Sequence, residues 1–377
     1  MTIWGSASES THAASLALPE VSLGYTPRGL AFDQLSLDRL EQRVGFSGWL
    51  ADDFALLGEL PRRPGVFDRY LSRDFEVDFD DSARGVFDSE TERIGTVMTI
   101  GVELEKRFRG TQGPIGVLTL QAYLLQADDL LDPLLLFNEV DDWQVEWRET
   151  NFNFAGLGSP LVNVRVGHFD LPFGLEHTIE DNGALRDHFQ SQNFGIEEDW
   201  GVTLNGRDEV FEYEAGWTRG SGNDFREDGD PGLVAGRFGA APDEAVRAGL
   251  SFLEGRTLDS RRNLVDRHRV GVDLQIAHRG WNFLTEAALG TDEDEDVHHE
   301  LFEVNWSSPY DSSLAWVQLR NESRRTDGWD DSVAATIGID LPFPGGWSFS
   351  AQWTQELHVF EDESRLGYLA LQLRMRR

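Results

Sequence analysis

Residues 347–359 read WSFSAQWTQELHV, a stretch in which apolar and polar side chains alternate. Alternation with a period of two places the apolar side chains on one face of a β-strand. Beyond a Glu-Asp-Glu-Ser segment, residues 369–375 alternate in the same way. We therefore expect the two segments to form an antiparallel hairpin with one apolar and one polar face.

The same alternation recurs along most of the chain. It predicts regular strands at 98–104, 143–147, 162–166, 211–217, 270–276, 302–306 and 333–341, and less regular ones near 44–50, 73–79, 115–125, 195–205, 232–239, 245–254, 281–289 and 312–320. We expect about sixteen to eighteen strands spaced by about 22 residues, which is wider than the spacing of a compact soluble sandwich. Such spacing is typical of membrane strands that are joined alternately by short turns and longer loops.

Period two alone does not separate a soluble sandwich from a membrane barrel, but two further features favour the barrel. Aromatic residues fall at predicted strand ends, as aromatic girdles would require: Trp281, Trp306, Trp347 and Tyr368. So many strands also exceed an ordinary sandwich, and closure into a barrel removes exposed edges. The sequence predicts an all-β, transmembrane antiparallel β-barrel with long acidic extracellular loops at 220–232, 291–299 and 321–331; a soluble all-β protein is the alternative.

The composition excludes several function classes. The chain has 377 residues, with 33 Lys and Arg against 67 Asp and Glu, a net charge of −34. This charge disfavours nucleic acid as a partner, because phosphate backbones are bound by Lys and Arg. The chain contains no Cys, which excludes disulfides, thiolate chemistry and covalent c-type haem attachment. No apolar run approaches the roughly 18 residues that a membrane-spanning helix needs.

The first part of the chain is expected to differ from the rest. We expect residues 1–42 to form an N-terminal segment at the periplasmic side or the barrel edge, with a short amphipathic helix near 34–44, and residues 43–377 to form the barrel. The opening Met1-Thr2-Ile3-Trp4 lacks the basic and then apolar pattern of a secretory signal. Either the protein is cytoplasmic, or its signal was removed before the numbering begins.

Residues 164–176, VRVGHFDLPFGLE, resemble a motif of the phosphate-selective porin family, in which Pro-Phe-Gly-Leu-Glu follows a strand and leads out of the barrel wall. Weaker similarities follow in the family's order at 193–195, 199–206 and 211–223. The resemblance spans residues 95–377 as a pattern. It implies a bacterial outer-membrane barrel of about sixteen strands with a water-filled lumen.

The polar strand faces supply candidate lumen-lining residues: Glu103, Glu105, Glu146, Arg148, Arg165, Glu212, Glu214, Asp273, Glu303, Arg320, Asp340, Glu356 and Arg374. The family's anion-selective members carry Arg and Lys in the constriction, whereas this chain has a single Lys, Lys106. Because carboxylates outnumber bases on the predicted faces, and rings of carboxylates select cations, we do not expect phosphate selectivity. We expect a passive channel for ions and small solutes, neutral to cation-preferring.

Two other functions are weighed against this one. A barrel of this kind could be a scaffold that sheaths a multihaem cytochrome in an electron conduit across the outer membrane. A surface enzyme could use the carboxylate pairs Glu103/Glu105 or Glu212/Glu214, which are spaced as in glycosidases. No catalytic, metal or cofactor motif is found, so we expect no enzyme activity, no cofactor and no metal. The expected partners are outer-membrane lipid, small solutes and a second copy of the chain in a homotrimer.

Overall fold

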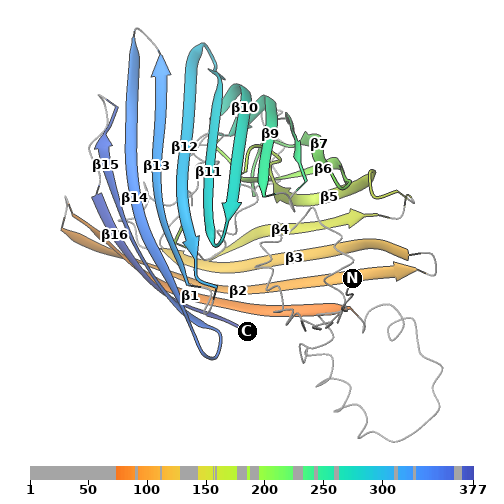
Figure 1. The fold of residues 1–377 in the computed structure, drawn as a ribbon, viewed down its shortest axis with the longest axis horizontal. Helices are drawn as coiled ribbons and strands as arrows, with labels where there is room; N and C mark the ends of the chain where they lie inside the picture. Colours follow the sequence, from red (N-terminus) through yellow and green to blue (C-terminus); the bar gives the residue numbers. More distant parts are fainter. Residues whose placement is uncertain are drawn as a thin grey trace, which may run out of the picture.

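The computed structural model describes residues 74–89, 92–110, 113–127, 143–155, 157, 159–175, 185–186, 195–223, 232–241, 245–258, 263–309, 313–325, 328–360 and 367–377. These residues form sixteen antiparallel strands that close into one barrel (Figure 1). The strands are β1 (Phe75–Asp88), β2 (Arg93–Gly110), β3 (Gly113–Ala127), β4 (Gln144–Phe154), β5 (Asn163–Asp170), β6 (Glu198–Arg207), β7 (Phe211–Thr218), β8 (Gly232–Ala240), β9 (Val246–Leu258), β10 (Leu264–His278), β11 (Trp281–Asp292), β12 (Glu295–Ser307), β13 (Leu314–Arg325), β14 (Trp329–Phe343), β15 (Trp347–His358) and β16 (Gly367–Arg376).

The barrel closes because its first strand pairs on both sides. β1 pairs with β2 over its full length and with β16 from Asp80↔Arg376 to Asp88↔Tyr368. Every other strand pairs with its neighbours in the sequence. The predicted all-β barrel is therefore confirmed, and its sixteen strands lie at the lower end of the expected range.

The connections differ at the two ends of the barrel. We call the end at which β1 begins and β16 ends the terminal end, and the opposite end the loop end. The connections at the terminal end are short, the longest being 155–162. One is the two-residue turn Arg279-Gly280 between β10 and β11, in which both residues have positive φ. The long connection 171–197 lies at the loop end.

For two of the three segments predicted to be long acidic loops, the prediction is wrong. Residues 291–299 form a tight hairpin in which β11 continues to Asp292 and β12 begins at Glu295. In 321–331, β13 continues to Arg325 and β14 begins at Trp329. Polar side chains can remain in a strand that extends beyond an apolar belt, and here Arg325 pairs with Asp296 across the strands at 3.3 Å. These two runs of charged residues therefore lie at the ends of paired strands and in the short turns between them.

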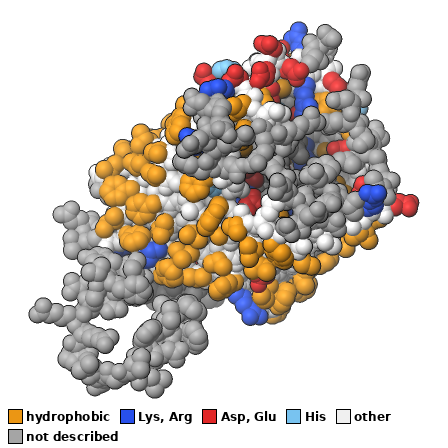
Figure 2. Space-filling model, turned by 180° about the vertical axis from the view of Figure 1, so that it is seen from behind, with side chains coloured by type: hydrophobic (Ala, Val, Ile, Leu, Met, Phe, Trp, Pro, Cys, Tyr) orange, Lys and Arg blue, Asp and Glu red, His pale blue; other side chains and the backbone are white. Residues whose placement is uncertain are grey.

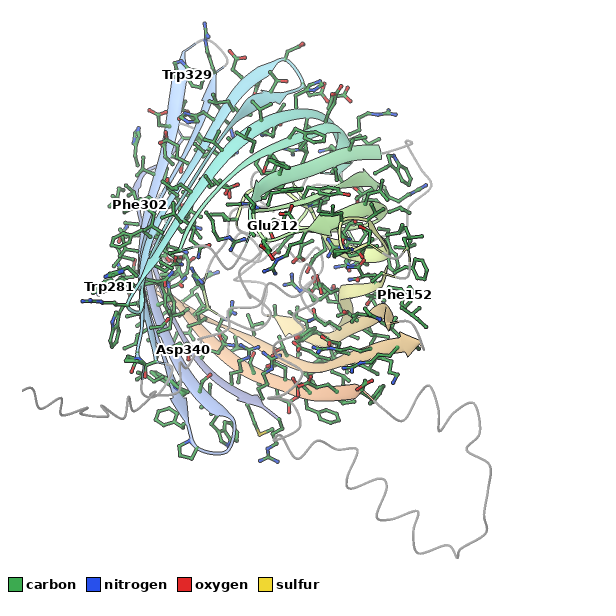
Figure 3. All side chains as sticks on the ribbon, turned by 45° about the vertical axis from the view of Figure 1, so that its right-hand side comes forward. Phe152, Glu212, Trp281, Phe302, Trp329 and Asp340 are labelled. Carbon is green, nitrogen blue, oxygen red and sulfur yellow. The ribbon has the colours of Figure 1, made fainter. Side chains whose placement is uncertain are left out.

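Alternation gives the barrel wall an apolar outer face (Figure 2). Large hydrophobic side chains on this face are exposed, among them Phe302 at 49%, Ile337 at 58% and Leu250 at 62%. Trp281 and Trp306 lie opposite each other on β11 and β12 near the terminal end, and Trp347 begins β15 at the same end. Trp281 and Phe302 both point away from the interior (Figure 3). This is the arrangement of an aromatic girdle at the terminal-end edge of an apolar belt.

The prediction that Tyr368 belongs to an outer girdle is wrong. Tyr368 shares the inward face of β16 with Ala370 and Gln372, and it packs against a buried apolar cluster. The reason is the phase of the strand, since Leu371 and Leu373 occupy the outward positions and are exposed.

Some predictions lie outside the described residues. These are the strand at 44–50, the helix near 34–44 and the N-terminal segment 1–42; the described barrel begins at Phe75. Within the described part of the chain, no helix is long and apolar enough to cross a membrane.

Candidate functional site

The segment that follows β5 turns into the barrel. Leu171, Phe173 and Leu175 are fully buried, and they pack against inward-facing residues of β8, β9, β11 and β12. The resemblance implied that Pro172-Phe173-Gly174-Leu175-Glu176 leads out of the wall; its described residues, 172–175, leave the wall where β5 ends and lie on its interior side. We call residues 171–175, together with Leu185 and Arg186, the inserted segment.

The local sequence explains why this segment lies inside. The inward faces of β8 and β9 carry Leu233, Ala235 and Leu253, all about 1% exposed. These apolar side chains give the inserted segment a surface on which to bury its own apolar residues. At Gly271 on β10 a Cβ atom would lie 2.6 Å from Cζ of Phe173, so the absence of a side chain there makes room for the ring.

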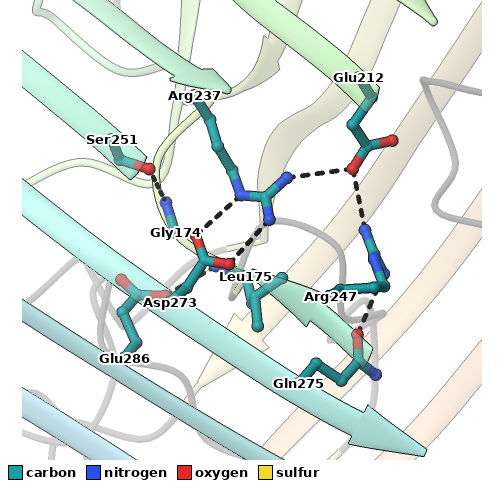
Figure 4. Close-up of polar contacts among 9 residues, drawn as sticks. All are labelled: Gly174, Leu175, Glu212, Arg237, Arg247, Ser251, Asp273, Gln275 and Glu286. Atoms are coloured by element: carbon teal, nitrogen blue, oxygen red, sulfur yellow. Dashed lines mark hydrogen bonds and ion pairs between the residues drawn. The ribbon is translucent and has the colours of Figure 1, made fainter. Parts of the chain in front are cut away.

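The backbone of Gly174 and Leu175 is held by two hydrogen bonds to the barrel wall (Figure 4). The N–H of Gly174 donates to Oγ of Ser251 at 2.9 Å, and the N–H of Leu175 donates to Oε2 of Glu286 at 2.7 Å. Gly174 has φ +61°, a left-handed conformation, and a Cβ atom there would overlap the Glu286 carboxylate. The position therefore requires glycine for two separate reasons.

A second anchor holds the other described part of the inserted segment. Nε of Arg186 donates to Oε2 of Glu303 at 2.8 Å, and Nη2 of Arg186 donates to Oε1 of the same carboxylate. Glu303 is fully buried and also accepts from Asn305 and Gln318. The adjacent Leu185 belongs to a buried cluster on the inward faces of other strands: Val86, Val97, Leu125, Ala127, Trp316 and Ala370. The inserted segment thus contacts both β8–β12 and the wall around β1–β3, β13 and β16.

Beside Gly174, buried charges form a network on β7 to β10 (Figure 4). Arg237 donates to both oxygens of Asp273, at 2.9 and 2.8 Å, and to Oε1 of Glu212 at 3.0 Å. Arg247 donates to the same Glu212 oxygen at 2.9 Å and to Gln275 at 3.0 Å. Glu212 points into the barrel (Figure 3) and is about 1% exposed. Each charge is therefore compensated by direct pairing in a region from which water is largely excluded.

Similar pairs continue around the inner wall. Arg165 pairs with Glu214 at 2.5 Å and with Glu149 at 3.6 Å. Glu103 accepts from the Tyr123 hydroxyl at 2.6 Å. Two further ion pairs join β16 to β1 and β2: Arg374 with Asp80, and Arg376 with Glu103 at 2.7 Å.

Most of the remaining predicted site residues lie nearer the two rims or are less buried, and Arg320 is the exception. Glu105 pairs with Arg107 at 2.6 Å, and Arg148 pairs with Glu198 at 2.7 Å. Asp340 accepts from Ser350 at 2.5 Å. Glu146 accepts a hydrogen bond from Asn223 at 3.2 Å, and the backbone carbonyl of Glu356 accepts one from Gln355. The Arg320 residue is buried, with 6% of its surface exposed. The structure thus joins Glu303 to the inserted segment and places the Glu212 and Asp273 network beside it (Figure 4). It pairs Arg165 with Glu214 elsewhere on the inner wall.

Sequence reasoning missed most of the buried bases. Seven Arg residues are buried in the described part of the chain: Arg165, Arg186, Arg237, Arg247, Arg267, Arg269 and Arg320. Lys106 is also buried, beside Phe108. Ten carboxylates are buried there: Asp80, Glu103, Glu149, Glu198, Asp199, Glu212, Glu214, Asp273, Glu286 and Glu303. The charges are therefore closer to balance than the nine acids and four bases counted on the predicted faces.

The missed bases have a physical explanation. Arg237 shares the inward face of β8 with Leu233 and Ala235, so neither face of this strand is purely polar in the sequence. Those apolar neighbours face the inserted segment, which the alternation pattern could not reveal. Glu149 was missed for another reason: the pairing of β3 with β4 shifts register between Leu120 and Ala122, and such a bulge moves later residues to the opposite face.

The structure offers no metal-binding constellation in its described ranges, where no group of three or more His, Cys, Asp or Glu residues could hold an ion. The two carboxylate pairs once considered for catalysis are already occupied by Arg, Tyr and Thr donors. The arrangement is that of a charged, internally paired inner wall around an inserted segment.

Comparison with known proteins supports the architecture. Neither the scan against protein-family models nor the search of curated proteins finds a match. Among solved structures, the Salmonella typhi OmpF complex with daunomycin matches with TM-score 0.60 and 8% identity, covering 80% of this chain and 97% of that one. OmpT of Vibrio cholerae matches with TM-score 0.57 and 10% identity, covering 80% and 97%. The anion-selective porin from Comamonas acidovorans matches with TM-score 0.57 and 8% identity, covering 80% and 99%. This chain has the sixteen-strand barrel fold of outer-membrane porins.

Proposed function

We propose that this chain is an outer-membrane porin, a passive channel for ions and small hydrophilic solutes. One observation carries the proposal: a closed sixteen-strand barrel has an exposed apolar outer wall, a polar inner wall and a segment of its own chain inserted into the interior. Closed barrels leave no backbone hydrogen-bonding group unpaired toward lipid. The fold comparisons with outer-membrane porins support the same location and role.

The ion preference that fits these charges is weak. On the inner wall, Arg237 is shared by Glu212 and Asp273, and Arg165 is shared by Glu214 and Glu149. Paired charges largely cancel at a distance, so they bias permeating ions less than an unpaired ring would. The excess of buried carboxylates over buried Arg leaves a modest bias toward cations. We therefore propose a neutral to weakly cation-preferring channel.

The inserted segment also favours a channel over a cytochrome sheath. Leu175 packs against β11 and β12, and Leu185 packs against a cluster on β1–β3, β13 and β16, so the chain itself takes up interior space that a multihaem cytochrome would need. The carboxylates considered for a surface enzyme are held by Arg237, Arg247 and Arg165. We therefore propose no enzyme activity for this barrel.

A homotrimer is the assembly that we propose. One of the structurally similar chains is OmpT of Vibrio cholerae described in a trimer form, with TM-score 0.52 and 10% identity. Light scattering of the purified protein in detergent gives the stoichiometry. A monomer by this measurement would contradict the proposed assembly and leave the channel proposal unaffected.

Planar-bilayer recording under a salt gradient tests the function. We expect stepwise conductance and a reversal potential displaced slightly toward the value for cations. Absence of conductance from folded protein would overturn the channel, and a clear anion preference would overturn the proposed selectivity. Haem absorbance that copurifies with the barrel would favour the conduit instead.

A further inference from the structure

The apolar belt on the outer wall is interrupted at β12 and β13. On β11 the outward positions from Trp281 to Leu289 are apolar or small, and on β14 those from Phe343 to Val333 are all apolar. On β12 the apolar outward positions end at Phe302, and on β13 they end at Leu319. The next outward residues are polar: Glu300 and His298 on β12, and Asn321 and Ser323 on β13. We call these four residues the polar notch.

The polar notch lies within the height of the belt. Glu300 lies six positions closer to the loop end than the girdle residue Trp306 on the same strand. With a rise of about 3.4 Å per residue and a strand tilt of about 40°, Glu300 lies about 15 Å above the girdle. The apolar band of an outer-membrane barrel is about 25 Å tall. Register places Ala287 of β11 directly beside Glu300, and Leu289, one outward position higher on β11, is still apolar and 54% exposed.

A carboxylate on the outer wall within the apolar belt needs a polar or charged partner. Ionisable side chains on a lipid-facing wall are unfavourable, and their presence within a membrane indicates a functional site. Oε1 of Glu300 lies 3.2 Å from Nε2 of His298, and its Oε2 accepts from Nδ2 of Asn321 at 3.5 Å. The Glu300 side chain is nevertheless 52% exposed, so a further group can reach it from the bilayer.

A pocket of about 290 Å³ opens beside the carboxylate. Two residues of the inward face, Glu286 and Leu301, also border it. Its other six lining residues are Thr285 and Ala287 with small side chains, Phe302 and Leu319 with large apolar ones, and Glu300 and Asn321 with polar ones. All six alternate in phase with the outward residue Phe302, whose side chain points away from the interior (Figure 3). The pocket therefore combines an apolar floor with an acidic edge.

We propose that the polar notch and this pocket bind one lipid whose headgroup carries an amine, with the ammonium on Glu300 and acyl-chain carbons over Thr285 and Ala287. Charge complementarity selects a cationic group for the acidic edge. The notch spans only two strands, about 5 Å apart, so its area is far below the roughly 800 Å² per partner of a stable protein interface. A single lipid fits this size, whereas a second protein does not.

The test rests on the membrane location that we propose and uses native mass spectrometry of the full chain in detergent. Phosphatidylethanolamine and phosphatidylglycerol are added at equal amounts, and retained lipid is counted. We expect wild type to retain phosphatidylethanolamine about fivefold better, as one charge contact near a membrane surface would give. Glu300→Gln should abolish the preference, and Ala287→Leu, which fills the pocket, should lose retained lipid of both kinds.

Glu254→Gln is the matched control, because Glu254 on β9 is also an outward carboxylate near a histidine, His268, at 3.9 Å. The neighbouring strand β10 is polar at this level, with His268 followed outward by Asp266, whereas β11 beside Glu300 is still apolar. This variant should retain the wild-type preference. Equal retention of both lipids by wild type, or the same preference in Glu300→Gln, would overturn the lipid site. So would a dimer that forms in wild type and disappears in Glu300→Gln. Conductance of the same preparations separates these outcomes from a failure of the channel itself.

Discussion

The carboxylate of Glu286, on β11, accepts a hydrogen bond from the backbone N–H of Leu175 at 2.7 Å, across 111 positions of sequence. This contact joins the barrel wall directly to the main chain of the inserted segment. Because the acceptor is charged and buried, the bond is worth about 1.5–3 kcal/mol by general measurements. It is one of the two anchors of the inserted segment, the other being the pairing of Arg186 with Glu303.

Replacing Glu286 with Ala should loosen the inserted segment. We expect the single-channel conductance to rise and to become noisier, and the free energy of unfolding to fall by about 1.5–3 kcal/mol. Bilayer recording and urea unfolding of the refolded barrel measure the two effects. Glu254→Ala, which removes an exposed outer carboxylate, should change neither. Unchanged conductance and stability in Glu286→Ala would mean that the contact does not hold the segment.

Gly174→Ala should destabilise the barrel. A non-glycine residue in the left-handed conformation costs about 1–2 kcal/mol, and here the new methyl group would also displace the Glu286 carboxylate. Gly85 on β1 is the matched control, since a Cβ there meets nothing within 4 Å, and Gly85→Ala should be neutral or slightly stabilising. Equal urea midpoints for the two variants would contradict the geometry at Gly174.

Arg186 and Glu303 should show strong energetic coupling. Arg186→Leu alone leaves a buried carboxylate without its main counter-charge, which costs about 3–5 kcal/mol. The double variant Arg186→Leu with Glu303→Leu should recover much of this loss, because no uncompensated charge remains. A double-mutant cycle on unfolding free energies measures the coupling, and additive losses would show that the two residues do not act as a pair.

Arg237→Ala should increase cation preference. Its removal leaves Glu212 with one Arg partner, Arg247, and takes both guanidinium contacts from Asp273, so the inner wall becomes more negative. We expect the cation-to-anion permeability ratio to rise about twofold, in the direction known for carboxylate-lined pores. Arg325→Ala removes an Arg that is 55% exposed at the loop end and should leave the reversal potential unchanged. A shift toward anions in Arg237→Ala would contradict the assignment.

Strand number and facing were predictable because they depend on local alternation. In β15, Trp353 is exposed while Gln352 and Thr354 are buried, as the sequence predicted. Burial on the inner wall was harder to predict because it depends on partners distant in sequence. Phe173 packs inside the barrel because Gly271 leaves room for its ring and Leu253 packs in the same buried cluster. Both neighbours are distant in sequence, so the pattern around Phe173 does not predict them.

Register shifts and extended strands account for the other errors. The bulge opposite Gln121 carries Glu149 onto the inward face, and alternation alone gives no sign of it. The acidic run at 291–299 was predicted to be a loop because charge usually marks solvent. It is instead a tight hairpin with positive φ at Glu293, since strands that extend past an apolar belt can keep charged residues in regular pairing.

The central claim is that ions cross the membrane through the interior of this barrel, and cysteine block tests it most directly. The chain has no native Cys. Ser82, on β1, pairs in register with Arg374 and hydrogen-bonds Thr99 at 2.6 Å on the inward face, and Ala83 is its exposed outward neighbour. Both Ser82→Cys and Ala83→Cys should conduct in steps, and a charged, membrane-impermeant thiol reagent should reduce the current of Ser82→Cys alone. No conductance from folded protein, or equal sensitivity of the two variants, would contradict the account.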